Sequence, residues 1–274
     1  MKKLFSLLFF SLAVIVANAQ GVWTQKADFP PGDRKIAVGF SIGTKGYIGT
    51  GVHVPTYTYS QAFWEWDQST NSWTQKASFG GGLRSDAVGF SIGNKGYIGL
   101  GYYGGFKKDL WEYEPTTNIW TQKVSFPGTG RQYATAFVIG TKAYVGTGWD
   151  GTVKNNDLYE WNQTTNTWTQ KSNLPGIARD YATSFSIGTK GYLGTGSMPS
   201  INELQDFWEY NPANDSWTQK NNFPGTARSW ASSFTIGNKG YLGTGVNGGT
   251  DLNDFWEYDP TTDTWIQMSN FGGV

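Results

Sequence analysis

The chain has 274 residues, of which 17% are aromatic and 37 are glycine, and its 21 basic residues equal its 21 acidic residues in number. A formal net charge of zero provides no basic field for nucleic acid, so we expect no nucleic-acid partner. Cysteine is absent and His53 is the single histidine, which excludes thiol nucleophiles, thiolate metal sites and disulfides.

Residues 1–19 have the pattern of a secretory signal peptide. Two lysines are followed by an apolar stretch from Leu4 to Val16, and Ala17-Asn18-Ala19 supplies the small residues of a cleavage site. The apolar stretch is shorter than the roughly 20 residues that span a bilayer. We therefore predict a secreted protein, whether extracellular, at the cell surface or periplasmic, which begins at Gln20 and has no membrane span after cleavage.

Residues 20–274 consist of one repeated unit, which a tryptophan closes. Successive copies of this tryptophan are 47 to 50 residues apart, a regular period within the range of propeller blades. The six tryptophans are Trp23, Trp73, Trp120, Trp168, Trp217 and Trp265. The predicted blades span about 33–76, 83–123, 130–171, 178–220 and 227–268.

Each unit contains four runs that are typical of strands and are bounded by Gly, Pro, Asn or Asp. In the fifth unit they are 229–236, 240–245, 254–258 and 264–268. Ile-Gly-Asn-Lys-Gly joins the first two, and its Gly and Asn tolerate the positive φ of a tight hairpin. Asp-Pro-Thr-Thr-Asp joins the last two, with proline presetting φ for a turn.

Two motifs in each unit resemble the kelch repeat. One is Tyr-x-Gly-x-Gly, as in Tyr241 to Gly245, where the kelch family usually has adjacent glycines. The other is an aromatic residue seven positions before the tryptophan, as in Trp66 with Trp73, Tyr113 with Trp120, Trp161 with Trp168, Tyr210 with Trp217, and Tyr258 with Trp265. This resemblance to the kelch and galactose oxidase-like superfamily implies an all-β fold, a kelch-type β-propeller.

Repeated aromatic residues are expected in the core, because both faces of a propeller blade are covered by its neighbours. They comprise the tryptophan that closes each unit and a phenylalanine on each first strand: Phe40, Phe90, Phe137, Phe185 and Phe234.

Charged residues also repeat. An arginine precedes each first strand and a glutamate lies in each third strand, namely Glu65, Glu112, Glu160, Glu209 and Glu257. The arginines could form a ring at the channel mouth that holds a carboxylate or sugar. We favour the alternative that Arg and Glu pair once per repeat as part of the scaffold, since a buried charge has to be paired. We expect Asp109, Asp157, Asp206 and Asp254 to cap a turn rather than bind metal, and the first unit has Ala62 at this position.

Loops between the second and third strands vary freely, and in propeller topology they share a face with the segments that enter the first strands. Aromatic rings with polar edges on such loops suit sugar faces or extended peptides. The candidate binding residues are Arg34, Arg84, Arg131, Arg179, Arg228, Tyr102, Tyr103, Trp149, Tyr133, Tyr181 and Trp230. We predict no catalytic residue, metal or cofactor.

Three classes of function remain open. The first is a secreted, non-enzymatic propeller that binds an extracellular protein or glycan. The second is a carbohydrate-active enzyme resembling kelch-type sialic acid epimerases, with Arg and Glu holding and deprotonating an acidic sugar. The third is a structural surface component. Copper chemistry of the galactose oxidase type is excluded, because that site needs two His, two Tyr and a Cys.

Six tryptophans for five complete units predict an additional partial blade. Val22 to Lys26 carries Trp23 without three preceding strands, and Phe271-Gly272-Gly273 matches Phe79-Gly80-Gly81, which leads into the next unit. We therefore expect five complete four-stranded blades plus a lone N-terminal strand of a sixth, in a sequence truncated from a longer protein. Trp23 should lie beside a gap, and exposed strand edges should favour association.

Overall fold

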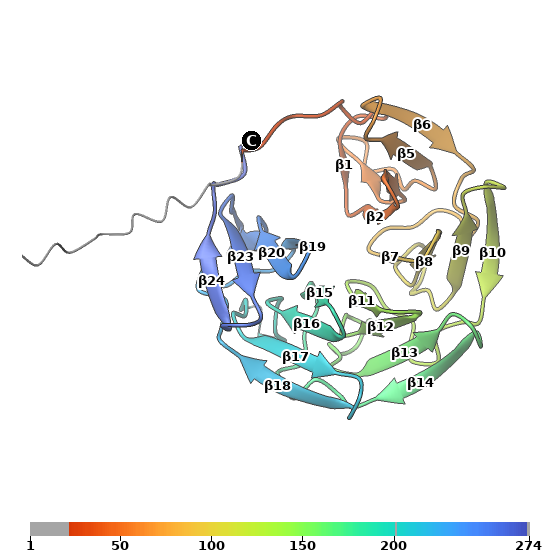
Figure 1. The fold of residues 1–274 in the computed structure, drawn as a ribbon. Coiled ribbons are helices and arrows are strands. Elements are labelled where there is room, and N and C mark those ends of the chain that lie inside the picture. The colour runs from red at the N-terminus through yellow and green to blue at the C-terminus, as the bar shows by residue number, and fades with distance from the viewer. Residues whose placement is uncertain (1–21, 201, 273–274) are drawn as a thin grey trace, which may run out of the picture.

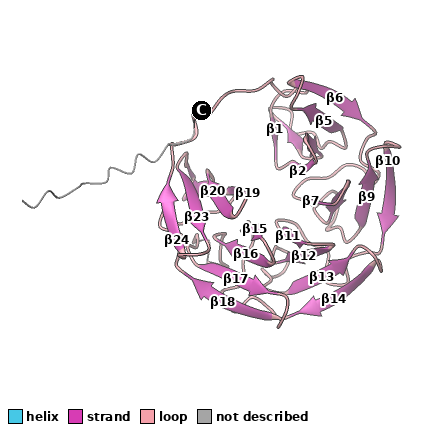
Figure 2. Cartoon of the chain, viewed as in Figure 1, coloured by secondary structure: helices cyan, strands magenta, loops and turns pink. Residues whose placement is uncertain are grey.

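The computed structural model describes residues 22–200 and 202–272, which contain strands and no helix. The predicted signal peptide lies outside the described residues. Five four-stranded antiparallel sheets surround a central axis like the blades of a propeller, which confirms the predicted fold (Figure 1, Figure 2). Within the described chain, no helix is long and apolar enough to cross a bilayer.

In every blade the strands follow chain order from the axis outward (Figure 1). The first blade consists of β2 (Val38–Ile42), β3 (Lys45–Gly49), β5 (Phe63–Asp67) and β6 (Ser72–Lys76). The second consists of β7 (Val88–Ile92), β8 (Lys95–Gly99), β9 (Leu110–Glu114) and β10 (Ile119–Lys123). The third consists of β11 (Thr135–Ile139), β12 (Lys142–Gly146), β13 (Leu158–Asn162) and β14 (Thr167–Lys171).

The two remaining blades have the same design. The fourth consists of β15 (Thr183–Ile187), β16 (Lys190–Gly194), β17 (Phe207–Asn211) and β18 (Ser216–Lys220). The fifth consists of β19 (Ser232–Ile236), β20 (Lys239–Gly243), β23 (Phe255–Asp259) and β24 (Thr264–Gln267). Two further two-stranded sheets pair β1 (Arg34–Lys35) with β4 (Val52–His53), and β21 (Val246–Asn247) with β22 (Thr250–Asp251).

The aromatic residue seven positions before each tryptophan has a structural explanation in the turn between the two outer strands. In the fourth blade this turn contains Asp215, which adopts a positive φ of 51°. Its Oδ1 atom accepts hydrogen bonds from the Tyr210 hydroxyl at 2.6 Å and from the Ser172 N–H at 3.0 Å. The Ser172 carbonyl in turn accepts from Trp217 Nε1 at 2.9 Å. Through these hydrogen bonds the motif connects the outer strands of a blade to the chain segment that precedes the blade.

At three of the four blade interfaces a phenylalanine of the inner strand packs against a glycine of the next blade, and Ala143 takes the glycine position opposite Phe90. Phe137 stacks on Tyr144 of its own blade, with ring centroids 5.1 Å apart, and its other side faces Gly191. A Cβ atom added to Gly191 would lie 2.0 Å from the Phe137 ring. Because glycine has no side chain, the ring can lie directly against the backbone of the next blade.

The predicted core is confirmed only in part. Phe90, Phe137 and Phe185 are buried, but Phe40 is half-buried and Phe234 is 40% exposed. The tryptophans that close the five blades are half-buried rather than core residues, because they lie on the outermost strand. The aromatic residues seven positions before these tryptophans are more deeply enclosed in four of the five blades, where Tyr113, Trp161, Tyr210 and Tyr258 have no exposed surface, while Trp66 is half-buried.

The ring is open between the first and fifth blades, as the sequence predicts. Inner strands contact each other in the order β2, β7, β11, β15 and β19, but among the described residues β19 and β2 make no contact. Figure 1 shows the empty sector between β19 and β2. On its fifth-blade side Phe234 and Ile236 are exposed, the latter by 62%.

Trp23 lies beside this gap and takes the position of a sixth anchor. Its Nε1 atom donates to the Ser269 carbonyl at 3.1 Å, and its ring packs edge-on against Phe255 at 4.9 Å and Phe271 at 5.2 Å. Trp265 makes the same three contacts one blade earlier, with Asn221, Phe207 and Phe223. No strand is assigned to Val22 to Lys26, because among the described residues no strand pairs with this segment.

Candidate functional site

Four of the five predicted binding arginines are enclosed by the fold. Arg179 is representative: Nη1 and Nη2 donate to the two carboxylate oxygens of Asp206 at 2.6 Å each, and Nη1 also donates to the Thr195 carbonyl at 3.0 Å. Each of these side chains is at most 1% exposed. The pairs are Arg84 with Asp109, Arg131 with Asp157, Arg179 with Asp206, and Arg228 with Asp254. These guanidinium groups serve the scaffold and are not presented to a ligand.

Two details of the sequence interpretation are corrected here. The arginines pair with aspartate rather than glutamate, and these aspartates bind arginine rather than cap a turn. Burial alone would raise the pKa of Asp206, but the hydrogen bonds and charge of Arg179 outweigh it and hold the pKa below its usual value.

The repeated glutamates have partners of their own. Each accepts a hydrogen bond from the tyrosine directly opposite on the second strand, as Glu257 does from Tyr241 at 2.7 Å. The other pairs are Glu65 with Tyr47, Glu112 with Tyr97, Glu160 with Tyr144, and Glu209 with Tyr192. Arg228 and Glu257, which would act together in an epimerase, therefore contact different groups.

The central channel mouth is formed by the residue two positions after each arginine. All five adopt a positive φ, between 51° and 61°. Four backbone hydrogen bonds join them across the blades: from the second blade to the fifth, the N–H donates to the equivalent carbonyl of the preceding blade at 3.1 to 3.3 Å. The residues, in blade order, are Ile36, Asp86, Tyr133, Tyr181 and Trp230. Non-glycine residues in this conformation are uncommon and cluster at functional sites.

These residues line a cavity of about 350 Å³, here named the axial pocket. Tyr133 and Tyr181 have ring centroids 3.9 Å apart, and the Trp230 ring follows at 4.9 Å from Tyr181. Trp230 is 49% exposed. Three of the predicted binding aromatics, from three consecutive blades, thus form one continuous row along the pocket.

Asp86 adds a carboxylate to the axial pocket, and it was not among the predicted binding residues. Ser85 Oγ donates to its Oδ2 atom at 2.5 Å, whereas Oδ1 is buried and has no hydrogen-bond partner among the described residues. Burial raises the pKa of Asp86 to about 6, although the Ser85 hydrogen bond opposes the shift. The sequence signal was its position, which is the one that carries an aromatic residue in three other blades.

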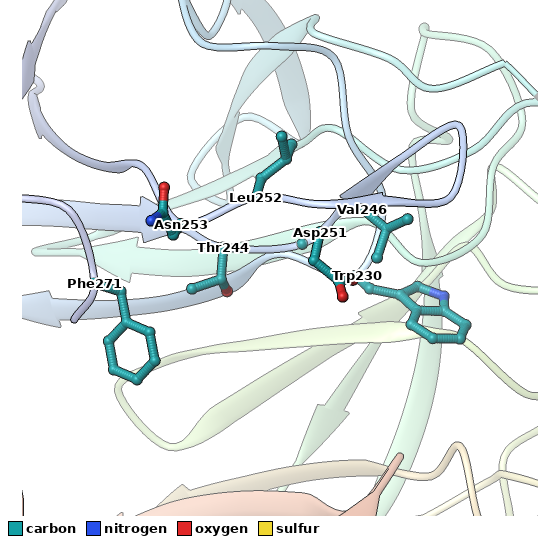
Figure 3. A pocket seen from close by; sticks show the side chains of 8 residues that line it. Trp230, Thr244, Val246, Asp251, Leu252, Asn253 and Phe271 are labelled. Atoms are coloured by element: carbon teal, nitrogen blue, oxygen red, sulfur yellow. The ribbon is translucent and has the colours of Figure 1, made fainter. Parts of the chain in front are cut away.

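A second cavity, of about 500 Å³, adjoins Trp230 on the fifth blade. Figure 3 shows Trp230 and Phe271 at its two ends with Thr244 between them. The gap in the ring explains why it is open. In the fourth blade the Gly196 N–H donates to the Arg228 carbonyl of the next blade at 2.8 Å, whereas Gly245 has no such partner among the described residues.

The kelch motif family matches residues 245–272, and no curated protein matches the chain. The match and the ring of four-stranded blades agree with each other. The chain is a kelch-repeat β-propeller. This fold supports a general function as a propeller that binds other proteins. Within the described part of this kelch propeller, no group of three or more His, Asp or Glu residues is placed to hold a metal ion.

Other predicted binding aromatics of the kelch propeller lie outside the axial pocket. Tyr103 is exposed and packs edge-on against Tyr59, at 5.1 Å, while Tyr102 packs against Phe106 at 5.2 Å. Trp149 is half-buried in the corresponding loop of the third blade. These residues do not line the axial pocket.

Arg34 differs from the other four arginines, since Ala62 replaces its aspartate partner and its Nη2 atom lies 3.0 Å from His53 Nε2.

Proposed function

We propose that this kelch-repeat propeller is secreted and binds an extracellular protein or glycan without catalysing a reaction, and that the axial pocket is the centre of the binding face. The observation that supports this most directly is the row of Tyr133, Tyr181 and Trp230 beside the unpartnered Asp86 Oδ1 atom. Aromatic faces bind the apolar faces of sugars and peptide side chains with little loss of conformational entropy.

Asp86 narrows the chemistry of the group that enters the pocket. A buried oxygen without a partner gains a hydrogen bond when a ligand supplies a hydroxyl or N–H donor. Above about pH 6 the carboxylate is ionised, so an acidic group at this point would be repelled. We therefore infer that the inserted group is a neutral sugar or a donor-bearing side chain, and this argues against an acidic sugar in the pocket.

The proposal is tested with the purified mature protein on an array of neutral and acidic oligosaccharides and on an array of extended peptides. Trp230→Ala should abolish the binding that the wild type shows, because it removes the most exposed ring of the row. Tyr57→Ala is the matched control, since Tyr57 is also exposed but does not line the axial pocket.

Equal binding by the wild type and Trp230→Ala would refute the assignment of the pocket. Epimerisation of a sialic acid by the wild type would refute the non-catalytic part of the proposal. Export is tested separately, by N-terminal sequencing of the protein recovered outside the cytoplasm, which should begin at Gln20.

A further inference from the structure

Three blades share a cluster in which one aspartate is held by an arginine and a tryptophan. In the fourth blade both oxygens of Asp206 accept from Arg179, and Oδ2 also accepts from Trp208 Nε1 at 2.7 Å. The same arrangement joins Asp109 to Arg84 and Trp111, and Asp254 to Arg228 and Trp256. A carboxylate thus satisfies guanidinium and indole donors together.

The first blade has the same frame without the carboxylate. Arg34 Nη1 donates to the Thr50 carbonyl at 3.2 Å, as Arg179 does to Thr195. The Thr50 N–H donates to the Ala62 carbonyl at 3.2 Å, so Ala62 occupies the backbone position of Asp206. The guanidinium group also lies over a phenylalanine ring in both the first and the fifth blade. The distance from Cζ to the ring centroid is 5.2 Å for Arg34 over Phe29 and 4.6 Å for Arg228 over Phe223.

Of the donors that hold this carboxylate in the other blades, the indole N–H has no acceptor in the first blade. Trp64 Nε1, which corresponds to Trp208 Nε1, is buried and has no hydrogen-bond partner among the described residues. Within residues 22–200 and 202–272, no carboxylate forms a salt bridge with Arg34. His53 accepts one hydrogen bond from Arg34 but offers no negative charge when it does so.

An uncompensated charge and an unmet buried donor are both costly. The burial of Arg34 without a counter-ion accordingly lowers the pKa of its guanidinium. Ala62 is partly exposed, so the position of the missing side chain can be reached from solvent.

We propose that Arg34 and Trp64 form a binding site for a ligand carboxylate, which takes the place of the aspartate side chain that Ala62 lacks. The planar guanidinium fork matches a carboxylate in two parallel hydrogen bonds, and Trp64 Nε1 supplies a third donor. The ligand is either a free small carboxylate of the size of formate or acetate, or the carboxylate end of a larger molecule. The site is separate from the axial pocket, whose lining includes neither residue.

The test compares the wild type with Ala62→Asp, which supplies the carboxylate from the chain itself. Sodium acetate replaces sodium chloride in steps at constant ionic strength, and the Tm and the tryptophan fluorescence are measured at each step. The wild type should show a saturable rise in Tm with acetate, because a ligand that binds the folded state stabilises it. Ala62→Asp should start at a higher Tm and show no saturable response.

Trp64→Phe provides a second variant that keeps an aromatic ring and removes the N–H group. It should bind acetate about tenfold more weakly, as expected for the loss of one hydrogen bond to a charged group. Acetyl-Ala-Ala with a free carboxylate, compared with its amide, distinguishes a small ion from the end of a larger ligand. Tighter binding of the peptide acid than of acetate indicates the larger ligand, and comparable binding indicates the small ion.

Two results would overturn the proposal. One is the absence of a saturable response of the wild type to both acetate and the peptide acid. The other is an equal response of the wild type and Ala62→Asp, which would place the effect elsewhere on the protein.

Discussion

The fourth and fifth blades have the same local structure on their inner strands, but the fifth blade covers the fourth, whereas the corresponding face of the fifth blade is open. Phe185 and Phe234 hold equivalent positions on inner strands, and each stacks on the tyrosine opposite, at 5.6 and 5.3 Å. Yet Phe185 is 5% exposed, because the next blade covers it with Gly240, whereas Phe234 is 40% exposed. The repeat therefore fixes the conformation of a blade, but the neighbouring blade supplies much of its burial.

Truncation of these two phenylalanines should give the largest difference. Phe185→Ala should lower the free energy of unfolding by about 3–5 kcal/mol, as is usual for a buried aromatic residue. Phe234→Ala should cost less than about 2 kcal/mol, because solvent already reaches its ring. Urea denaturation of both variants measures the difference. Equal losses would show that the fifth-blade face is covered in solution, for example by self-association, which sedimentation at several concentrations would detect.

A smaller difference is expected for the glycines that receive these rings. A methyl group at Gly191 would lie 2.0 Å from the buried Phe137 ring, so Gly191→Ala should destabilise the fold by about 1–3 kcal/mol. Gly46 is the equivalent position on the first blade, where the nearest atom to an added Cβ is Trp66 Cε3 at 3.6 Å. Gly46→Ala should thus change stability by less than about 0.5 kcal/mol. A large cost at Gly46 would mean that another element fills the gap.

The sequence predicted the blades well because their determinants are periodic and local. Tryptophan spacing, hairpin turns and strand patterns all repeat within one unit, and the five blades and the gap beside Trp23 are as expected. The carboxylate partner of each arginine was harder to predict from the sequence, because it depends on which strand ends lie close together in the fold. Glu209 lies opposite Tyr192 in the register of neighbouring strands, which leaves Asp206 for Arg179.

The candidate sites show the same limit. Tyr133, Tyr181 and Trp230 were identified because their positions are equivalent in the repeat and their residue types suit binding. Asp86 was missed at the same position, since its role follows from the burial of Oδ1. The alanine at position 62 was visible in the sequence, but its consequence depends on the burial of Trp64 Nε1, which results from the packing of the first blade.

The smallest expected effect concerns Asp86 and is a dependence on pH. Its pKa is raised from an ordinary 3.8 to about 6 by burial, so between these values the folded state binds more protons than the unfolded state. The contribution of Asp86 to stability is therefore most favourable below about pH 4 and is lost as the pH rises through about 6. Asp86→Asn removes the charge, keeps an acceptor for Ser85, and should stabilise the protein at high pH.

Partial exposure of Asp86 reduces the expected gain to on the order of 1 kcal/mol, or about 2–4 °C in Tm. Thermal melts at about pH 8 and about pH 4 measure it, and the gain should shrink toward zero at the lower pH as the wild-type carboxyl group becomes protonated. Asp33→Asn, at an exposed aspartate, controls for the change in net charge and should shift Tm little at either pH. A gain from Asp86→Asn of equal size at both pH values would contradict the titration and point instead to better packing of the amide, because packing does not depend on protonation.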